Sequence, residues 1–157
     1  MIKCTLEDLY EFNKTNNYIK NNKVKVHTRH GLKSIEAVDI TAKDSVQHRI
    51  VTSSGKSIIS SPDHLFFDDD WKKAKLFKVG DIIETVNGIE FIVSNTILKE
   101  TADLYDIQVE DVKEFYANGF VSHNSTIANA IVYALYGKVE GIKMADLPNR
   151  INKELWV

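Results

Sequence analysis

Short runs of β-forming residues bounded by turn sequences constrain the fold of this chain more than any other feature. From Val24 onward, runs rich in Val, Ile, Thr and Phe alternate with turn sequences at Arg29-His30-Gly31, Ser54-Gly55 and Asn87-Gly88. Asn87-Gly88 is the strongest hairpin signal, because both residues tolerate the positive φ that a type I′ turn requires. The chain has two prolines, so little interrupts these runs. The pattern predicts a mostly β domain.

Residues 5–17 and the segment after Ser125 have helical spacing instead. Thr5 with Asp8 has the form of a capping box, and the apolar residues that follow Thr5 are Leu6, Leu9, Tyr10 and Phe12. Residues 14–25 are rich in Asn and Lys, which predicts a solvated connector. The segment after Ser125 predicts a second helix that ends at Gly137.

Composition limits the class of protein. With 157 residues, 43% of them hydrophobic, the chain can bury the core of one globular domain. A net charge of -2 favours neither a nucleic-acid partner nor a membrane partner, and we expect a monomer. The single cysteine excludes an internal disulfide and a Cys-based zinc cluster. Without a signal peptide or an 18-residue apolar run, we expect a cytoplasmic protein.

The most reactive side chains stand at the two borders of the β segment. Cys4 is the only cysteine, and a thiol is the strongest nucleophile among the common side chains. At the other border, Asn124 can attack its own peptide carbonyl, and the Ser125 hydroxyl can accept an acyl group. Either border alone means little, because a lone cysteine usually packs as a small hydrophobe. Together they could cut and rejoin a backbone.

Other polar residues lie inside the β segment. Ser61 and His64, three residues apart, can both reach one carbonyl, although a turn begun by Ser-Pro-Asp with a partly exposed His64 is the simpler interpretation. Asp106 on its own predicts a surface carboxylate beside a turn. Three further histidines lack metal-ligand spacing and are expected to face solvent, so we predict no metal and no cofactor; they are His27, His30 and His48.

In combination, these motifs resemble the inteins, which are self-splicing protein elements. The family pattern runs from a first Cys through a Thr/Ser-x-x-His motif and an Asp-bearing strand to a terminal His-Asn, and here it covers Cys4 to Asn124 in order. The resemblance implies an all-β, horseshoe-like Hedgehog/intein (HINT) fold with a short N-terminal helix and no inserted endonuclease. It divides the chain into an N-extein remnant (1–3), a splicing domain (4–124) and a C-extein fragment with a helix (125–157).

The resemblance also implies a role for each matching residue in the first cleavage. Cys4 would attack the Lys3 carbonyl to form a thioester, and Ser61 and His64 resemble the pair that contacts and protonates the departing Cys4 nitrogen. Asp106 resembles the residue that tunes the Cys4 thiol and couples the two cleavage steps.

The second cleavage and the ligation follow by the same resemblance. Ser125 would take the acyl group as a branched ester, and Asn124 would cyclise to a succinimide with the help of His123. An O-to-N acyl shift would then join Lys3 to Ser125, so the partners of this single-turnover reaction are the flanking extein segments. Where the family often carries a second His, this chain has Lys113. Either His123 acts alone in cyclisation, or burial lowers the pKa of Lys113.

The flanks carry a further resemblance. Joining Lys3 to Ser125 gives Lys-Ser-Thr followed by a helical pattern, which is similar to the end of a P-loop in DNA-repair ATPases. Ile2 stands where such loops have Gly, so we expect truncated host sequence or a cloning junction and not a working ATPase.

Three alternatives stay open. An autoprocessing domain would cleave without ligating, and a fragment of a P-loop ATPase with an inserted β module would bind nucleotide. Residues 5–25 also resemble inteins that are split near the N-terminus, which implies two halves fused near Asn21-Asn22 and a complementary intein half as the natural partner.

Overall fold

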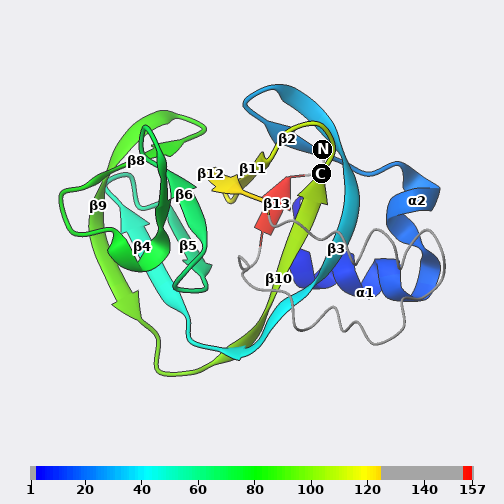
Figure 1. Ribbon diagram of the computed structural model, residues 1–157, viewed down its shortest axis with the longest axis horizontal. Helices are drawn as coiled ribbons and strands as arrows, with labels where there is room; N and C mark the ends of the chain where they lie inside the picture. Colours follow the sequence, from blue (N-terminus) through cyan, green and yellow to red (C-terminus); the bar gives the residue numbers. More distant parts are fainter. Residues whose placement is uncertain (1–2, 125–153, 157) are drawn as a thin grey trace.

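The computed structural model describes residues 3–124 and 154–156, and it is built mainly from antiparallel strands (Figure 1). Its helices are α1 (Leu6–Asn16), α2 (Tyr18–Asn22) and the 3-10 helix η1 (Ala74–Leu76). Its strands are β1 (Lys3–Thr5), β2 (Lys25–Thr28), β3 (Gly31–Ser45), β4 (His48–Thr52), β5 (Ser57–Ser60), β6 (Leu65–Phe67), β7 (Trp71–Lys73), β8 (Ile82–Thr85), β9 (Gly88–Ile97), β10 (Ala102–Val109), β11 (Glu114–Ala117), β12 (Phe120–His123) and β13 (Glu154–Trp156). The prediction of a mostly β domain is confirmed.

Two sheets organise these strands. The larger sheet has the order β1-β13-β11-β12-β8-β9-β4-β5, with β6 paired to both β12 and β7. The smaller sheet has the order β10-β3-β2. Figure 1 shows the long strands β3 and β10 on one side of the molecule, the lobe of β4, β8 and β9 on the other, and the β11–β12 hairpin between them. Both ends of the 4–124 segment therefore come close to the centre of the fold.

The predicted hairpins form, but one turn differs in type from its prediction. In the β8–β9 hairpin only Gly88 has a positive φ, at 100°, so this turn is not type I′. The β11–β12 hairpin contains the same dipeptide, and there Asn118 and Gly119 both have positive φ, at 48° and 82°. The type I′ conformation therefore occurs at Asn118-Gly119 and not at Asn87-Gly88.

Helix α1 begins where the capping pattern predicts. The Thr5 hydroxyl accepts a hydrogen bond from the Asp8 backbone N–H at 2.9 Å, which satisfies one of the free donors of the first turn. Leu6 and Leu9 are 0% and 1% exposed, so one face of the helix packs into the core. Phe12, by contrast, is 49% exposed and does not belong to that face.

The connector predicted for residues 14–25 is partly wrong. Most of its side chains are exposed, as expected, but α1 continues to Asn16 and α2 follows at once. Ile19 and Val24, each 7% exposed, anchor this segment in the core. The Asn13 side-chain oxygen also accepts a hydrogen bond from the Ile19 N–H at 2.9 Å. The segment is therefore a short helix with one buried residue, Ile19, and not a fully solvated connector.

One hydrophobic core joins the two sheets and α1. Its largest fully buried side chains are Phe66, Phe115, Phe120, Leu6, Leu9, Ile50, Ile83, Ile92, Leu104 and Ile107. The expectation that His48 faces solvent is wrong, because His48 is 9% exposed and its Nδ1 lies 3.0 Å from the Asn95 side-chain oxygen. Of the helices in the described part of the chain, none has the length and apolar character needed to cross a membrane.

Candidate active site

The end of β12 holds the backbone of Asn124 in place. The Asn124 backbone N–H donates to the Lys113 carbonyl at 3.0 Å, which extends the β11–β12 hairpin by one residue. The His123 Nδ1 lies 2.6 Å from the carbonyl oxygen of Asn124. A carbonyl oxygen can only accept, so the proton of this hydrogen bond is on Nδ1. The imidazole is therefore in position to polarise the carbonyl of the bond that follows Asn124.

The surroundings of His123 favour a neutral imidazole. Burial lowers the pKa of His123, and the nearby charge of Lys113 acts in the same direction, although the hydrogen bond to Asn124 and the charge of Glu114 oppose them. The ring also packs edge-on against the Trp71 ring, with 4.8 Å between the centroids. Near neutral pH, His123 can therefore donate from Nδ1 and accept a proton at Nε2.

Asn124 and Ser122 are buried without all of their hydrogen bonds. Asn124 is 6% exposed, and within residues 3–124 and 154–156 its Oδ1 has no hydrogen-bond partner. The Ser122 hydroxyl, on a residue with 0% exposure, likewise lacks a partner among the described residues. Burial keeps bulk water away from the side-chain amide and the backbone carbonyl of Asn124. This favours attack of the amide on that carbonyl over hydrolysis of the peptide bond.

The Ser61 and His64 motif forms a buried turn. The His64 N–H donates to the Ser61 carbonyl at 3.3 Å, and the two residues are 1% and 4% exposed, respectively. The His64 ring packs against Phe66, with 4.9 Å between the centroids. The turn that the simpler interpretation predicts is present, but the prediction that His64 is partly exposed is wrong. A buried hydroxyl and imidazole at one turn remain candidates for chemistry.

Strand pairing brings this motif beside the end of β12. Phe66, two residues after His64, pairs with Ser122, one residue before His123. The aromatic rings of Phe66 and Phe120 also pack together, with 6.1 Å between the centroids. The two histidines are 59 positions apart in sequence numbering, from 64 to 123, yet the turn with His64 leads directly into β6, which pairs with the strand that carries His123.

Cys4 lies on β1, which is joined to the β11–β12 hairpin through β13. Leu155 of β13 pairs with Cys4 on one side and with Ala117 on the other. The Cys4 side chain is partly buried and packs against the core. Burial raises the pKa of its thiol, and the charge of Asp8 raises it further. The thiol is therefore mostly protonated near neutral pH, and attack on a carbonyl requires a group that takes its proton.

Asp106 is fully buried, so its interpretation as a surface carboxylate is wrong. One carboxylate oxygen of Asp106 accepts the backbone N–H of Ile107 at 2.8 Å. Across the β3–β10 ladder it stands directly opposite Asp39, which is 4% exposed. Two acidic side chains thus lie buried at facing positions of the ladder, and Asp106 is a candidate for a functional role.

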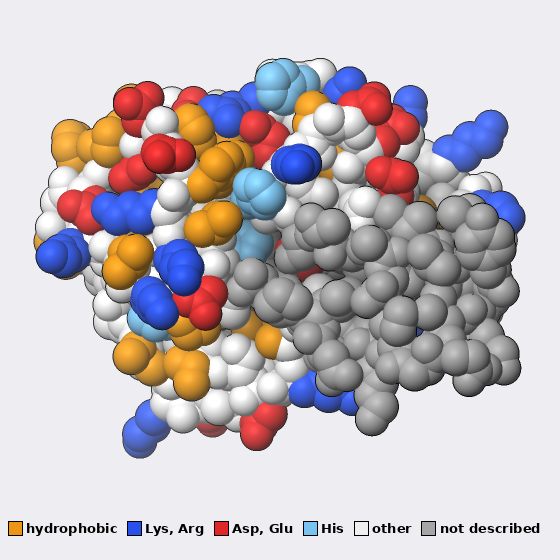
Figure 2. Space-filling view, viewed as in Figure 1, with side chains coloured by type: hydrophobic (Ala, Val, Ile, Leu, Met, Phe, Trp, Pro, Cys, Tyr) orange, Lys and Arg blue, Asp and Glu red, His pale blue; other side chains and the backbone are white. Residues whose placement is uncertain are grey.

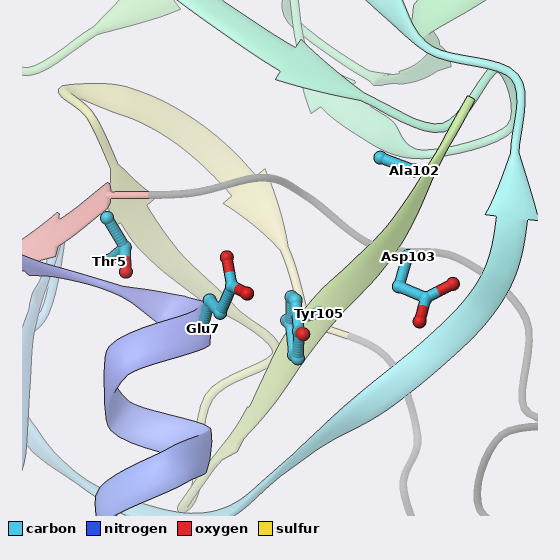
Figure 3. Close-up of a pocket in the computed structure, with 5 residues that line it drawn as sticks. All are labelled: Thr5, Glu7, Ala102, Asp103 and Tyr105. Carbon is cyan, nitrogen blue, oxygen red and sulfur yellow. The ribbon is translucent and has the colours of Figure 1, made fainter. Parts of the chain in front are cut away.

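A cavity of about 260 Å³ joins the neighbours of Cys4 and Asp106 (Figure 3). Thr5 and Glu7 line it from the N-terminal segment, and Ala102, Asp103 and Tyr105 line it from β10. Burial raises the pKa of Tyr105 to about 12, and Glu7 and Asp103 add to this effect. The cavity shows that the segment after Cys4 packs along the strand that carries Asp106.

Lys113 contributes its backbone and not a buried side chain. The side chain is exposed, while the carbonyl oxygen accepts the Asn124 N–H. Ser125, the candidate acyl acceptor, and the helix predicted after it lie outside the described residues. No cluster of three or more His, Cys, Asp or Glu side chains within residues 3–124 and 154–156 is arranged to hold a metal ion.

Four residues of this region were not predicted from the sequence. Trp71 contacts His123, Glu114 pairs with His123 across the hairpin, Asp8 acts on the Cys4 thiol, and Asp39 faces Asp106. The Thr5–Asp8 capping pattern could have indicated that Asp8 lies near Cys4. The Glu114–His123 pair follows from the hairpin at Asn118-Gly119, whereas the contacts of Trp71 with His123 and of Asp39 with Asp106 join distant segments, which no local pattern reveals.

No protein-family model matches the sequence, and no curated protein matches it. Solved structures do match. The VidaL intein has 22% identity and a TM-score of 0.66, with 75% of this chain and 79% of that chain covered. A DnaB intein from Synechocystis sp. PCC 6803 has 21% identity and a TM-score of 0.57, with coverages of 68% and 85%. These two show a shared fold, and the prediction of a Hedgehog/intein fold is confirmed.

A third match extends the similarity to the sequence. It is a consensus engineered intein described as having an atypical split site, with 34% identity and a TM-score of 0.56. The alignment covers 66% of this chain and 83% of that chain. At this identity and coverage, the match shows a family relationship and not only a common fold.

Proposed function

The chain belongs to the intein family of self-splicing proteins, and from this premise we propose that residues 4–124 excise themselves and join Lys3 to Ser125. One observation carries the proposal. The His123 Nδ1 lies 2.6 Å from the carbonyl oxygen of the bond that must break at the C-terminal border. A hydrogen bond at this atom stabilises the oxyanion that forms when the Asn124 amide attacks.

The first step in this proposal is the conversion of an amide into a thioester. The Cys4 sulfur forms a bond to the Lys3 carbonyl carbon, the bond from that carbon to the Cys4 nitrogen breaks, and the nitrogen leaves as an amine. Because burial and Asp8 raise the pKa of the thiol, its proton must be taken up as the bond forms. His64 returns a proton to the departing nitrogen, and Ser61 holds the carbonyl.

The acyl group then moves to the downstream flank. The Ser125 hydroxyl oxygen attacks the thioester carbon, and the Cys4 sulfur leaves and takes up the hydroxyl proton. Residues 1–3 are now held on Ser125 as an ester. Juxtaposition of the two borders replaces a bimolecular encounter, an effect that reaches effective molarities of about 10⁵ M in favourable cases.

Cyclisation of Asn124 releases the element. The Asn124 amide nitrogen forms a bond to the Asn124 carbonyl carbon, the bond to the Ser125 nitrogen breaks, and a proton passes to that nitrogen. His123 donates from Nδ1 to the carbonyl oxygen. The exposed side chain of Lys113 leaves this step to His123, and the Lys113 carbonyl fixes the Asn124 backbone. The free amine of Ser125 finally attacks the ester and forms an ordinary peptide bond.

Intact-mass analysis over time tests this function. Freshly prepared chain should lose the full-length mass and yield two species, residues 4–124 and the ligated 1–3/125–157 product. Ser125→Ala should yield cleavage products without ligation. Ligation absent in the unmutated chain, with cleavage intact, would favour the autoprocessing domain that cleaves only. An unchanged mass together with nucleotide binding would instead identify an ATPase fragment with an inserted β module.

We extend the proposal to the origin of the chain as two halves that meet near Asn21-Asn22. The residues from 20 to 23 are exposed, Lys23 has a positive φ of 50°, and a related intein with 34% identity is described as having an atypical split site. Residues 1–21 and 22–157, prepared separately and mixed, should therefore reconstitute splicing. No product after mixing, with an active fused chain, would contradict the split. The P-loop host is a further proposal, which rests on the Lys-Ser-Thr junction alone.

A further inference from the structure

Side chains from three parts of the chain form a cluster next to His123, which we call the bracket and define as Arg29, Phe67, Trp71 and Glu114. The Trp71 ring meets the His123 ring edge-on, at 4.8 Å and 88°. The Phe67 ring packs on Trp71 at 5.2 Å and 79°, and the Arg29 guanidinium lies 4.2 Å from the Phe67 ring centroid. These contacts run without interruption from the β2–β3 turn to His123.

Arg29 connects the bracket to the β11–β12 hairpin, which carries His123. The Arg29 Nε and Nη2 donate to the two carboxylate oxygens of Glu114 at 2.5 and 2.7 Å, a bidentate pair with a fixed geometry. Glu114 in turn pairs with His123 across the β11–β12 ladder. The backbone of His123 is thus held in register with Glu114, and the Trp71 ring contacts the imidazole itself.

The β6–β7 hairpin holds Trp71 rigidly. Phe67 and Trp71 are the strand pair next to the turn of this hairpin, and the backbone N–H of Trp71 donates to the Asp70 carboxylate at 2.7 Å. Next to Trp71, the Lys72 ammonium contacts the carboxylates of Asp68 and Asp81 at 3.5 and 3.0 Å. Because these contacts fix the β6–β7 hairpin, the Trp71 ring is suited to hold the orientation of the His123 imidazole and not only to fill space.

We propose that Trp71 is a positioning residue for the cyclisation of Asn124, an inference that rests on the splicing function proposed above. Trp71 holds the plane of the His123 imidazole so that the Nδ1–H points at the Asn124 carbonyl oxygen. Arg29 and Phe67 support Trp71 from behind. Without the ring, the imidazole distributes over several rotamers, and only a fraction of the molecules keep the hydrogen bond.

The rate of C-terminal cleavage alone tests this role. In a Cys4→Ala chain the N-terminal steps cannot occur, so the appearance of residues 1–124 by mass reports Asn124 cyclisation. We expect Trp71→Leu to slow this rate about ten-fold and Trp71→Phe to stay within about three-fold of the parent, because Phe keeps an aromatic edge. Phe91→Leu is the matched control, since Phe91 is 56% exposed on β9, away from the site.

The pH profile separates positioning from general damage. Burial is the largest cause of the lowered pKa of His123, so removal of the Trp71 ring should raise the pKa of His123 and move the inflection of the rate profile to higher pH. A merely structural role lowers the rate at every pH and leaves the inflection in place. The charged and titratable groups around His123 stay unchanged in this variant; they are Lys113 just before β11, Glu114 on β11, Arg29 and His30 at the β2–β3 turn, and Lys72, Asp68 and Asp81 around β7.

Fluorescence provides a readout without any reaction. The chain has two tryptophans, so Trp156→Phe leaves Trp71 as the only indole. Protonated imidazole quenches indole emission on contact, and the emission of Trp71 should therefore fall as the pH decreases through the pKa of His123. The same titration in a His123→Asn chain should be flat. A step that persists in His123→Asn would overturn the contact.

The outcomes distinguish this inference from the function on which it rests. A Cys4→Ala parent that never cleaves after Asn124 overturns the splicing function. A parent that cleaves, with Trp71→Leu at the same rate and inflection, overturns only the role of Trp71. If Trp71→Leu fails to fold, Phe67→Leu removes the support and leaves the indole. An unshifted profile and unchanged rate in that variant would also overturn the proposal.

Discussion

His123→Ala should affect one chemical step and spare the other. The substitution removes the Nδ1–H that lies 2.6 Å from the Asn124 carbonyl oxygen. A neutral hydrogen bond in water is worth about 0.5 to 1.5 kcal/mol, whereas a preorganised donor to a developing oxyanion is worth about 2.7 to 4 kcal/mol. His123 is half-buried, which favours the lower part of the second range. We therefore expect cyclisation to slow by about 100-fold.

Two assays isolate the steps. In a Cys4→Ala background, mass analysis of the chain cleaved after Asn124 reports cyclisation. In an Asn124→Ala background, cleavage by added thiol reports thioester formation at Cys4, and His123→Ala should leave that rate within about two-fold. A cyclisation rate within three-fold of the parent would refute carbonyl polarisation by His123. An equal loss in both assays would mean that the substitution disturbs the fold.

The pH dependence of cyclisation follows from the environment of His123. Burial lowers the pKa of the imidazole, so the residue is neutral at pH 7 to 8 and its contribution to the rate should be constant there. The rate should change only below about pH 6.5, the ordinary pKa of histidine. Protonation also favours the unfolded chain, because the folded pKa is the lower one, so stability due to His123 is lost as the pH falls below the unfolded value.

Three further predictions concern stability, each measured by thermal or urea denaturation. Glu90→Gln should cost about 1 to 3 kcal/mol of stability at pH 7, because hydroxyl donors hold this buried carboxylate at 2.5 to 3.1 Å. Burial acts to raise the pKa of Glu90, but these hydrogen bonds outweigh it and the pKa is lowered. The cost of the substitution should therefore fade below about pH 4.5, and a cost that persists there would refute the prediction. Gly119→Ala should cost about 1 to 2 kcal/mol through its φ of 82°, since the nearest atom, 2.9 Å away, belongs to the flexible end of Lys56, and a neutral effect would contradict this. Phe66→Ala should cost about 3 to 5 kcal/mol by leaving a cavity, and a cost below 1 kcal/mol would show that the core closes.

Local signals predicted the strands well, but not the conformation of each turn. Asn-Gly occurs twice, and the two copies adopt different turns. At Asn118 the side-chain amide donates to the Ser57 carbonyl at 2.5 Å, a contact with β5 that holds the residue at positive φ. At Asn87 the backbone N–H instead donates to the Thr85 hydroxyl at 3.2 Å, and φ is not positive. Tertiary contacts decide between turns that the dipeptide permits equally.

In the candidate site, too, the sequence predicted some residues, while others depend on tertiary contacts. Chemical motifs predicted His123, Asn124 and His64, because reactive residue types in a given order are visible in a sequence. The bracket was not predictable, since Arg29 and Glu114 are 85 positions apart and only the fold brings them together. Lys113 shows a different limit. The sequence directed attention to its ammonium group, while the structure uses its carbonyl oxygen, which any residue could supply.

An exposed apolar stripe on β9 lies apart from all of these contacts. Alternate residues of the strand face outward, and Figure 2 shows hydrophobic side chains gathered on this side of the molecule. The members of the stripe are Ile89, Phe91, Val93 and Ile97, each 48% to 67% exposed. Substitutions there change neither the ring contacts nor the hydrogen bonds at His123, which is why this strand supplies the control variant for the site.

The register of β12 explains how one short strand can serve both borders. Glu114 fixes the position of His123 from β11, and Phe66 fixes the position of Ser122 from β6. A slip of one residue would turn His123 to the opposite face, away from the Trp71 ring. Strand β6 begins directly after His64, so a shift of β6 displaces the buried turn of the N-terminal motif and the register of β12 together. We therefore propose that the pairing of β6 with β12 helps to coordinate the two cleavages, alongside the role proposed for Asp106.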